Sequence, residues 1–223
     1  MRLILLSLLF AGQAFAQGYP SKPIHLVVGF TPGGAADFVA RSFADPLSRA
    51  LGQSIVVDNK PGAGSSIAAE YVAKSTPDGY TVLIASPSSI LVNPLLNPKI
   101  GYNSFRDLAP VSKVSSSPLV VAVNPGVGVN TLAEFIALAR KNPGKLNFAS
   151  SGNGSAPHLA AVLFQRVAGV ELLHVPYKGG AGAVQSVLAG DMFTSLGHTR
   201  RQLAQVVQSQ SSGASVRSVP VWA

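Results

Sequence analysis

The 223-residue chain contains no cysteine, so its fold uses neither disulfides nor thiolate chemistry. Its four histidines are scattered in no spacing typical of metal ligands, and we predict no metal site. We also expect no cofactor. Charged residues make up only 12% of the chain against 47% hydrophobic residues, a balance typical of a globular protein and not of a disordered one.

Negative charge is scarce. The 17 Lys and Arg residues outnumber the 9 Asp and Glu residues, which gives a formal net charge of +8. This balance suits nucleic acid, an anionic membrane or small anionic ligands. The basic residues stand singly, no aromatic residues interleave with them, and the densest group (Arg140, Lys141, Lys145) falls where a helix is expected to end. We therefore predict a solvated basic surface and no nucleic-acid partner.

Catalytic motifs are also missing. The chain has no P-loop and no G-x-S-x-G elbow, and its G-x-G runs at 62–64 and 152–154 lack the third glycine of the dinucleotide fingerprint. His158 follows Ser155 on one helix face, but no orienting acid is near, so we interpret it as a helix N-terminal or packing residue. Asp37 stands in the first turn of a helix, where the dipole alone favours an acid. Without a nucleophile–base pair, we predict no enzyme and no catalytic residues.

The first sixteen residues have the pattern of a secretory signal peptide. Arg2 is followed by the apolar run 3–11 and by the small-x-small site "AFA" at 14–16. The apolar run is too short to span a bilayer, which takes about 20 residues, and no later run is long enough. The pattern predicts cleavage after Ala16 and a soluble, periplasmic protein.

Beyond this segment, strand-like and helix-like runs alternate. Apolar, β-branched runs predict strands at 24–30, 54–59, 80–86, 108–114, 118–124, 145–150 and 171–177. Helical periodicity predicts helices at 35–51, 65–75, 87–96, 131–142, 155–169 and 181–190. We expect a kink or break at Pro46, a serine cap opening the helix at 65–75, and a Thr131–Glu134 capping box. The alternation indicates an α/β fold with mostly parallel sheets.

Three strand-to-helix junctions are rich in glycine: "FTPGGAAD" (30–37), "SSGNGSAPH" (150–158) and "PYKGGAGA" (176–183). In α/β folds, ligands bind beyond the carboxyl ends of strands, where the free N–H groups of helix N-termini stabilise an anion. A plain turn explains any one junction by itself. Their occurrence in separate halves of the chain favours an anion clamp.

Three long segments of the chain, 19–41, 56–83 and 142–191, closely resemble the Bug (TctC-like) extracytoplasmic solute-binding proteins of tripartite tricarboxylate transporters. The motifs that carry the resemblance are P-G-G-x-x-D, the N-x-P-G-A-G type of run, G-x-L-N-x-A-S-S-G-x-G and H-V-P-Y-K-G. Together they cover essentially all of residues 19 to 191.

This resemblance implies a two-domain, periplasmic-binding-protein-like (Venus flytrap, type II) fold with the ligand between the domains. The first domain would be 17–120 and the second 121–197. The implied partners are a small carboxylate and the membrane subunits of a tripartite tricarboxylate system, and we expect a monomer. The ligand itself is not implied.

The resemblance also implies the binding residues. In this family one turn from each domain binds a ligand carboxylate through main-chain amides and bridging waters. The matching positions here are Phe30, Thr31, Pro32, Gly33, Gly34 and Ala35 in the first turn and Ser151, Gly152, Asn153, Gly154 and Ser155 in the second. Asp37 would meet the amine of an amino-acid ligand or only hold its loop. Tyr177, Lys178 and Gly179 match a junction near the cleft.

The C-terminal part departs from the family. Residues 198–223 carry no acidic residue, no α/β alternation and a Ser/Gln-rich middle, which predicts a divergent, disordered tail. Family members instead return to the first domain, so its C-terminal part would be missing here. We hypothesise a truncated or frameshifted copy, impaired in folding or binding because sheet surface is left uncovered.

Two alternatives of other kinds stay open. The first is a binding module that senses a carboxylate and signals to a membrane partner without transport. The second is a small-molecule enzyme on a similar α/β scaffold, which the missing nucleophile–base pair disfavours. Neighbouring genes for membrane components would separate transport from sensing.

Overall fold

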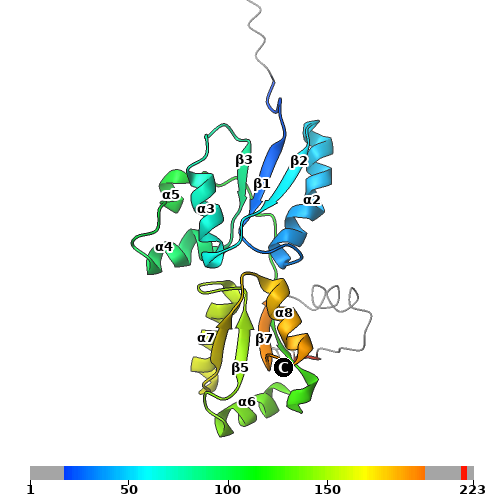
Figure 1. Ribbon diagram of the computed structural model, residues 1–223, viewed down its shortest axis with the longest axis vertical. Coiled ribbons are helices and arrows are strands. Elements are labelled where there is room, and N and C mark those ends of the chain that lie inside the picture. Colours follow the sequence, from blue (N-terminus) through cyan, green and yellow to red (C-terminus); the bar gives the residue numbers. More distant parts are fainter. Residues whose placement is uncertain (1–17, 199–216, 220–223) are drawn as a thin grey trace, which may run out of the picture.

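The structure is a computed structural model that describes residues 18–198 and 217–219. The predicted signal peptide at 1–16, and residues 199–216 and 220–223 of the predicted tail, lie outside the described residues. The described chain forms two α/β lobes stacked along the long axis of the molecule, each built on its own sheet (Figure 1).

The first lobe holds a parallel sheet of order β2-β1-β3. Its strands are β1 (Ile24–Val28), β2 (Ile55–Asn59) and β3 (Thr81–Ile84). The central strand β1 is almost continuously apolar, as expected for a strand buried on both faces, and four of its five residues are buried. Helix α2 (Ala35–Leu51) packs against β1 and β2, and α3 (Ser66–Ala73) packs against β3.

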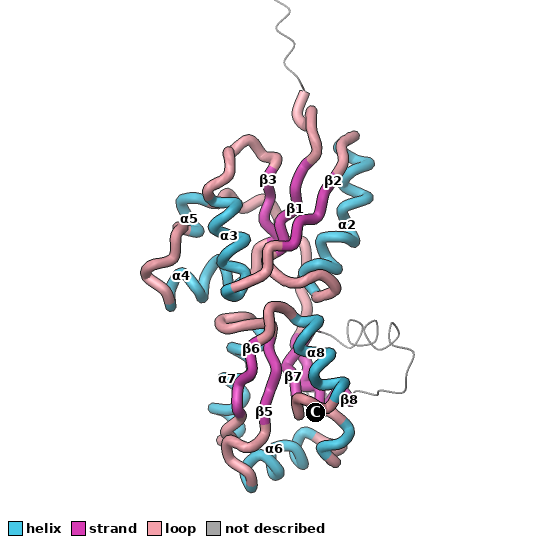
Figure 2. Tube along the Cα trace, in the orientation of Figure 1, coloured by secondary structure: helices cyan, strands magenta, loops and turns pink. Residues whose placement is uncertain are grey.

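The second lobe holds a mixed sheet of order β6-β5-β7-β4-β8. Its strands are β4 (Leu119–Val123), β5 (Asn147–Ser150), β6 (Leu173–Pro176), β7 (Thr194–His198) and β8 (Arg217–Val219). Strand β5 lies between β6 and β7 (Figure 2) and pairs in parallel with both, whereas β4 runs antiparallel to β7 and β8. Over the two sheets together, four of the six strand pairings are parallel, so parallel pairings predominate as the sequence predicts. Residues 217–219 depart from the disorder expected of the tail because they pair with the edge of β4.

Three helices complete the second lobe: α6 (Leu132–Lys141), α7 (Ala156–Ala168) and α8 (Gly180–Ala189). The Thr131–Glu134 capping box is confirmed, with each side chain bonded to the other residue's backbone N–H. At the other end of α6, Arg140 donates to the carbonyl of Ala168 and so ties α6 to the last turn of α7. The core between them contains the fully buried rings of Phe135 and Phe148.

The segment between β3 and β4 differs from prediction. The helix expected at 87–96 is a π-helical turn, Ser88–Val92, followed by α4 (Asn93–Leu96); a further turn, α5, spans Ser104–Asp107. The strand predicted at 108–114 is wrong. Residues 109–116 are exposed and pair with no described strand, so their apolar residues have no sheet to enter.

Two local predictions are wrong in part. Helix α2 continues through Pro46 without a break. Pro46 is exposed, so water can satisfy the carbonyl whose helical partner is lost. Helix α3 does begin after Ser65, but the Ser65 side chain makes no capping hydrogen bond, because its φ of +75° places it in the left-handed region.

Candidate functional site

The first predicted turn joins the carboxyl end of β1 to the start of α2. Gly33 has a φ of +78°, a conformation that glycine adopts at little cost. Gly34 is the N-cap of α2 and offers no side-chain cap, so the first N–H groups of the helix stay open. Within the described residues, the N–H groups of Gly34 and Ala35 donate to no protein acceptor. This turn therefore presents backbone donors and a helix N-terminus.

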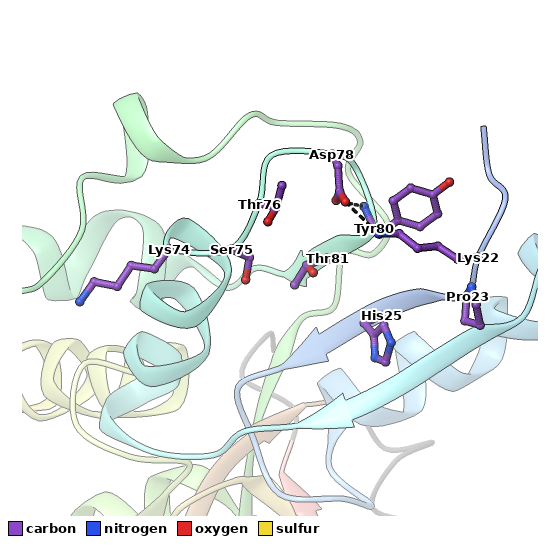
Figure 3. Close-up of a pocket in the computed structure, with 9 residues that line it drawn as sticks. All are labelled: Lys22, Pro23, His25, Lys74, Ser75, Thr76, Asp78, Tyr80 and Thr81. Carbon is purple, nitrogen blue, oxygen red and sulfur yellow. Dashed lines mark hydrogen bonds and ion pairs between the residues drawn. The ribbon is translucent and has the colours of Figure 1, made fainter. Parts of the chain in front are cut away.

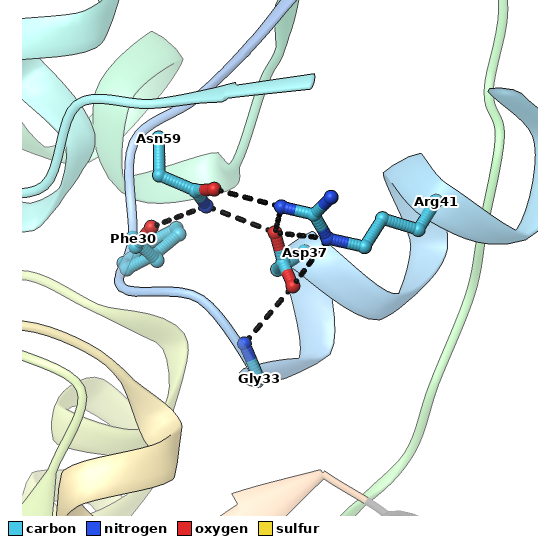
Figure 4. A network of polar contacts seen from close by, with 5 residues as sticks. All are labelled: Phe30, Gly33, Asp37, Arg41 and Asn59. Carbon is cyan, nitrogen blue, oxygen red and sulfur yellow. Dashed lines mark hydrogen bonds and ion pairs between the residues drawn. The ribbon is translucent and has the colours of Figure 1, made fainter. Parts of the chain in front are cut away.

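A buried carboxylate holds the first turn from behind (Figure 4). Asp37 is 3% exposed and accepts from the Gly33 N–H at 2.9 Å and from Arg41 Nε at 3.0 Å. Asn59 Nδ2 donates both to Asp37 Oδ1 at 3.0 Å and to the Phe30 carbonyl at 3.0 Å, which links β2 to the turn. The network therefore fixes both ends of the turn.

The electrostatics of Asp37 agree with a holding role. Burial acts to raise the pKa of Asp37, but hydrogen bonds from Arg41, the Gly33 N–H and Asn59 outweigh it and keep the pKa below its usual value. Both carboxylate oxygens are already bonded by protein donors. Of the two roles expected for Asp37, this geometry favours holding the loop over meeting a ligand amine.

The second predicted turn, 151–155, joins β5 to α7 and is held by side chains behind it. The Gly152 N–H donates to Ser150 Oγ at 3.1 Å, and the Gly154 N–H donates to His158 Nδ1 at 3.1 Å. Ser155 caps α7 by accepting from the His158 N–H. Within the described chain, the N–H groups of Ser151 and Asn153 donate to no protein acceptor. This turn too presents open backbone donors.

Two histidines and a phenylalanine lie stacked beneath the second turn. The ring centroids of His158 and His174 are 4.1 Å apart with an interplanar angle of 14°, and Phe148 stacks on His174 at 4.7 Å. His174 Nε2 lies 2.7 Å from Ser150 Oγ. The interpretation of His158 as a packing residue agrees with this position, but His174 and Ser150 had not been predicted.

The third glycine-rich junction brings the two lobes into contact. The Thr31 N–H donates to the Lys178 carbonyl at 3.3 Å. A Cβ on Gly179 would lie 2.3 Å from Thr31 Oγ1, so any side chain at this position would have to displace Thr31. Tyr177 is half-buried, and its carbonyl would lie 3.1 Å from a Cβ on Gly152. The structure thus gathers the predicted segments around 31, 152 and 177–179.

A fourth turn, 62–66, belongs to this contact and was not predicted as part of the site. A Cβ on Gly64 would lie 2.6 Å from the Asn153 carbonyl of the other lobe. Asn93 Nδ2 fixes this turn by donating to the Ala63 carbonyl at 2.9 Å and to Ser66 Oγ at 2.7 Å. The P-G-A-G run at 61–64, one of the motifs that carry the family resemblance, is the sequence signal for this turn.

Within that turn, Ser65 combines two unfavourable features. It is fully buried in the left-handed region, with a φ of +75°. Its Oγ is the one buried side-chain oxygen or nitrogen of the described residues that lacks a hydrogen-bond partner. It packs on Gly29, where a Cβ would come within 1.9 Å of Ser65 Oγ.

A hollow of about 480 Å³ lies at the amino-terminal end of β1, away from these turns (Figure 3). Its lining includes Lys22, Lys74 and His25, which gives it a basic character. Lys22 already pairs with Asp78 at 3.1 Å, and Lys74 pairs with Glu70 at 2.5 Å. With its lysines paired, this hollow is a weaker candidate for an anion than the turns.

Other kinds of site are not found in the described part of the chain. There, no three His, Cys, Asp or Glu side chains gather as metal ligands would. No helix among the described residues has the length and apolar character needed to cross a membrane.

Comparison with known proteins identifies the family to which this arrangement belongs. The two-lobed fold is that of a periplasmic binding protein, with 90% of the chain aligned to such a structure. The model of the family described as tripartite tricarboxylate transporter family receptor (TctC) matches residues 39–218. The chain therefore belongs to the TctC family, as the sequence motifs indicate.

Two curated relatives are each 42% identical to the chain. One is the UPF0065 protein in the tcbD-tcbE intergenic region of Pseudomonas sp. (strain P51), matched over 82% of this chain and 55% of its own length. The other is Protein BugT of Bordetella pertussis, matched over 81% and 56%. The chain thus spans about half the length of the curated relatives it matches.

Solved structures agree with the fold. R. palustris Rpa4515 with adipate is 34% identical with a TM-score of 0.84, covering 90% of this chain and 66% of that one. MatC from Rhodopseudomonas palustris with bound malate is 26% identical with a TM-score of 0.80, at the same coverage. The expected two-domain, periplasmic-binding-protein-like fold with mostly parallel sheets is confirmed.

Proposed function

We propose that this chain is an extracytoplasmic solute-binding protein that captures a small carboxylate between its lobes for delivery to the membrane subunits of a tripartite tricarboxylate-type transporter. The ligand carboxylate is held by open backbone N–H groups of the turns at 30–35 and 151–155. Tyr177, Lys178 and Gly179 border the same place from the second lobe.

The observation that carries this proposal is that two turns with open N–H groups, one from each lobe, both lie against the segment 177–179. Gly34 and Ala35 offer donors at the N-terminus of α2, and Ser151 and Asn153 offer donors ahead of α7. Backbone donors and helix dipoles favour an anion without supplying a competing side chain. Dicarboxylates in two similar structures, adipate and malate, support the ligand class.

Such a site recognises the functional group that all its ligands share. Charge-assisted bonds from backbone N–H groups are about twice as strong as neutral ones. They are the same for any carboxylate, so the choice among carboxylates falls to side chains elsewhere. The net charge of +8 adds attraction for anions at long range.

A matched pair of glycine variants tests the proposal. Gly33 and Gly52 both have positive φ, +78° and +67°, and a Cβ on either would meet no atom closer than 4.0 Å. Alanine should therefore cost each site a similar strain of about 1 kcal/mol. Only Gly33→Ala should weaken the binding of adipate or malate measured by calorimetry. Equal affinities in the two variants would contradict the clamp.

The predicted impairment of the chain is a separate hypothesis. It rests on the tail, most of which lies outside the described residues, so it stays a prediction. A thermal-shift screen of small carboxylates tests it, because a bound ligand raises the melting temperature. No rise in this chain, together with a rise in a version carrying a family C-terminus, would support impairment. A cooperative transition raised by a dicarboxylate in this chain would contradict it.

A further inference from the structure

The contacts beneath the second turn fix the protonation state of His158. The Gly154 N–H donates to His158 Nδ1 at 3.1 Å, so Nδ1 must carry a lone pair and the ring proton must sit on Nε2. A second ring proton, on Nδ1, would place an N–H donor against the Gly154 N–H donor, and the hydrogen bond between them would be lost. The bond that holds Gly154 therefore exists only while His158 is neutral.

His174 extends the same support to the start of the turn. Its Nε2 bonds with Ser150 Oγ at 2.7 Å, and that hydroxyl accepts from the Gly152 N–H at 3.1 Å. The His174 ring lies between those of Phe148 and His158 in a near-parallel arrangement. Two rings with centroids 4.1 Å apart cannot both carry a positive charge without strong repulsion.

Among the described residues, no carboxylate forms an ion pair with either ring. Burial alone lowers the pKa of His158, while burial and then the neighbouring His158 lower that of His174, to about 4. The charged residues carried by or flanking α7 and β6 are Arg166, Glu171 and Lys178, and all three are exposed. Strand β5 and helix α8 carry none, and β7 sets Thr194 and Ser195 against β5.

We propose that His158 and His174 are positioning residues for the carboxylate turn at 151–155, and that protonation of this pair in acid releases the bound carboxylate. The inference rests on the proposed function and adds its regulation. Neutral His158 holds the Gly154 amide inward, and Ser150, bonded to His174, holds the Gly152 amide, which leaves the Ser151 and Asn153 amides open to a ligand. Protonation frees Gly154, and the turn loses that arrangement.

Variants of His158 separate the acceptor from the ring. His158→Asn keeps an acceptor at the position of Nδ1 but cannot be protonated; His158→Phe keeps the stacked ring but offers no acceptor. The exposed His25, at the far end of β1, supplies the control His25→Asn. Affinity for malate is measured by calorimetry between pH 8 and pH 5 in all four proteins, so that titration of malate itself is common to them.

The wild-type dissociation constant should rise relative to that of His158→Asn as the pH falls, by up to about tenfold per pH unit below the pKa of His158. His25→Asn should follow the wild type. His158→Phe should bind malate weakly at every pH. Like His158→Asn, it should show only the pH dependence of affinity that comes from malate itself. Equal pH profiles in the wild type and His158→Asn would overturn the inference.

A readout without ligand separates this failure from failure of the proposed function. In NMR spectra, the amide signal of Gly154 should shift with the titration of His158 in the wild type and stay constant in His158→Asn. A Gly154 signal that titrates identically in both proteins refutes the positioning role, whatever the affinity. A normal Gly154 titration without malate, adipate or other carboxylate binding at any pH refutes the proposed function, and the release step with it.

Discussion

The turns at 30–35 and 151–155 look alike in sequence but are supported by opposite chemistry. The first rests on a charged group: Asp37, bonded to Arg41 and Asn59, holds the Gly33 N–H. The second rests on neutral rings, with His158 holding the Gly154 N–H. A carboxylate of lowered pKa keeps its charge well into acid, whereas the half-buried imidazole of His158 must stay uncharged to act as an acceptor. Acid should therefore weaken the second support long before the first.

The largest loss of stability is expected when the first support, the Asp37 network, is removed. Asp37→Ala removes the acceptor of the Gly33 N–H and the carboxylate partner of Arg41, and it leaves Asn59 Nδ2 bonded to the Phe30 carbonyl alone. We expect the free energy of unfolding to fall by about 3 kcal/mol, measured by urea denaturation. Asp45→Ala, an exposed change on the same helix, should alter it by less than about 0.5 kcal/mol. Similar losses in the two variants would show that the Asp37 network contributes little.

The second support, the His158–His174 pair, should make the free energy of unfolding depend on pH. The pKa of His174 is lowered to about 4, so the folded chain binds fewer protons than the unfolded chain between the ordinary histidine value and pH 4. Stability is then complete above about pH 6.5 and falls as the pH drops towards 4, by about 2 kcal/mol once partial exposure is allowed for. Asp37 loses its contribution only at lower pH.

Urea denaturation from pH 7.5 to pH 4 measures this fall. His174→Phe should remove much of the slope, because the ring stack is kept and the titrating group is lost. A wild-type slope that persists in His174→Phe would place the responsible group elsewhere.

The smallest effect concerns the turn at 62–66, where the backbone of Ser65 is strained. Ser65→Gly should relieve the left-handed conformation and raise the free energy of unfolding by about 0.5 to 1 kcal/mol after the entropy of glycine is counted. Ser65→Ala removes the unpaired hydroxyl but keeps the strain. A gain as large in Ser65→Ala would mean that the buried oxygen, and not the backbone, carries the cost.

The sequence predicts what local chemistry decides. The capping box at Thr131, the helix start at Ser155 and the buried strand at 24–28 follow from a few neighbouring residues each. The strand expected at 108–114 fails because strand formation needs a partner, and the apolar residues alone do not supply one.

The same limit explains what was missed in the site. The glycine turns are visible in the sequence, but their supports come from other elements. Asn59 reaches the first turn from β2, and His174 reaches the second from β6, 24 residues beyond its partner Ser150. Such contacts depend on strand order and register, which periodicity does not reveal.

The hydrogen bond from the Thr31 N–H to the Lys178 carbonyl makes the Thr31 amide a reporter of the separation of the two lobes. It joins the backbones of the two lobes directly at 3.3 Å, beside a glycine that leaves no room for a side chain. Whenever the lobes part, the Thr31 proton meets solvent and can exchange for deuterium. The hydrogen–deuterium exchange rate of the Thr31 amide would therefore report how often the lobes separate. A ligand that bridges the lobes would lower this rate without contacting Thr31.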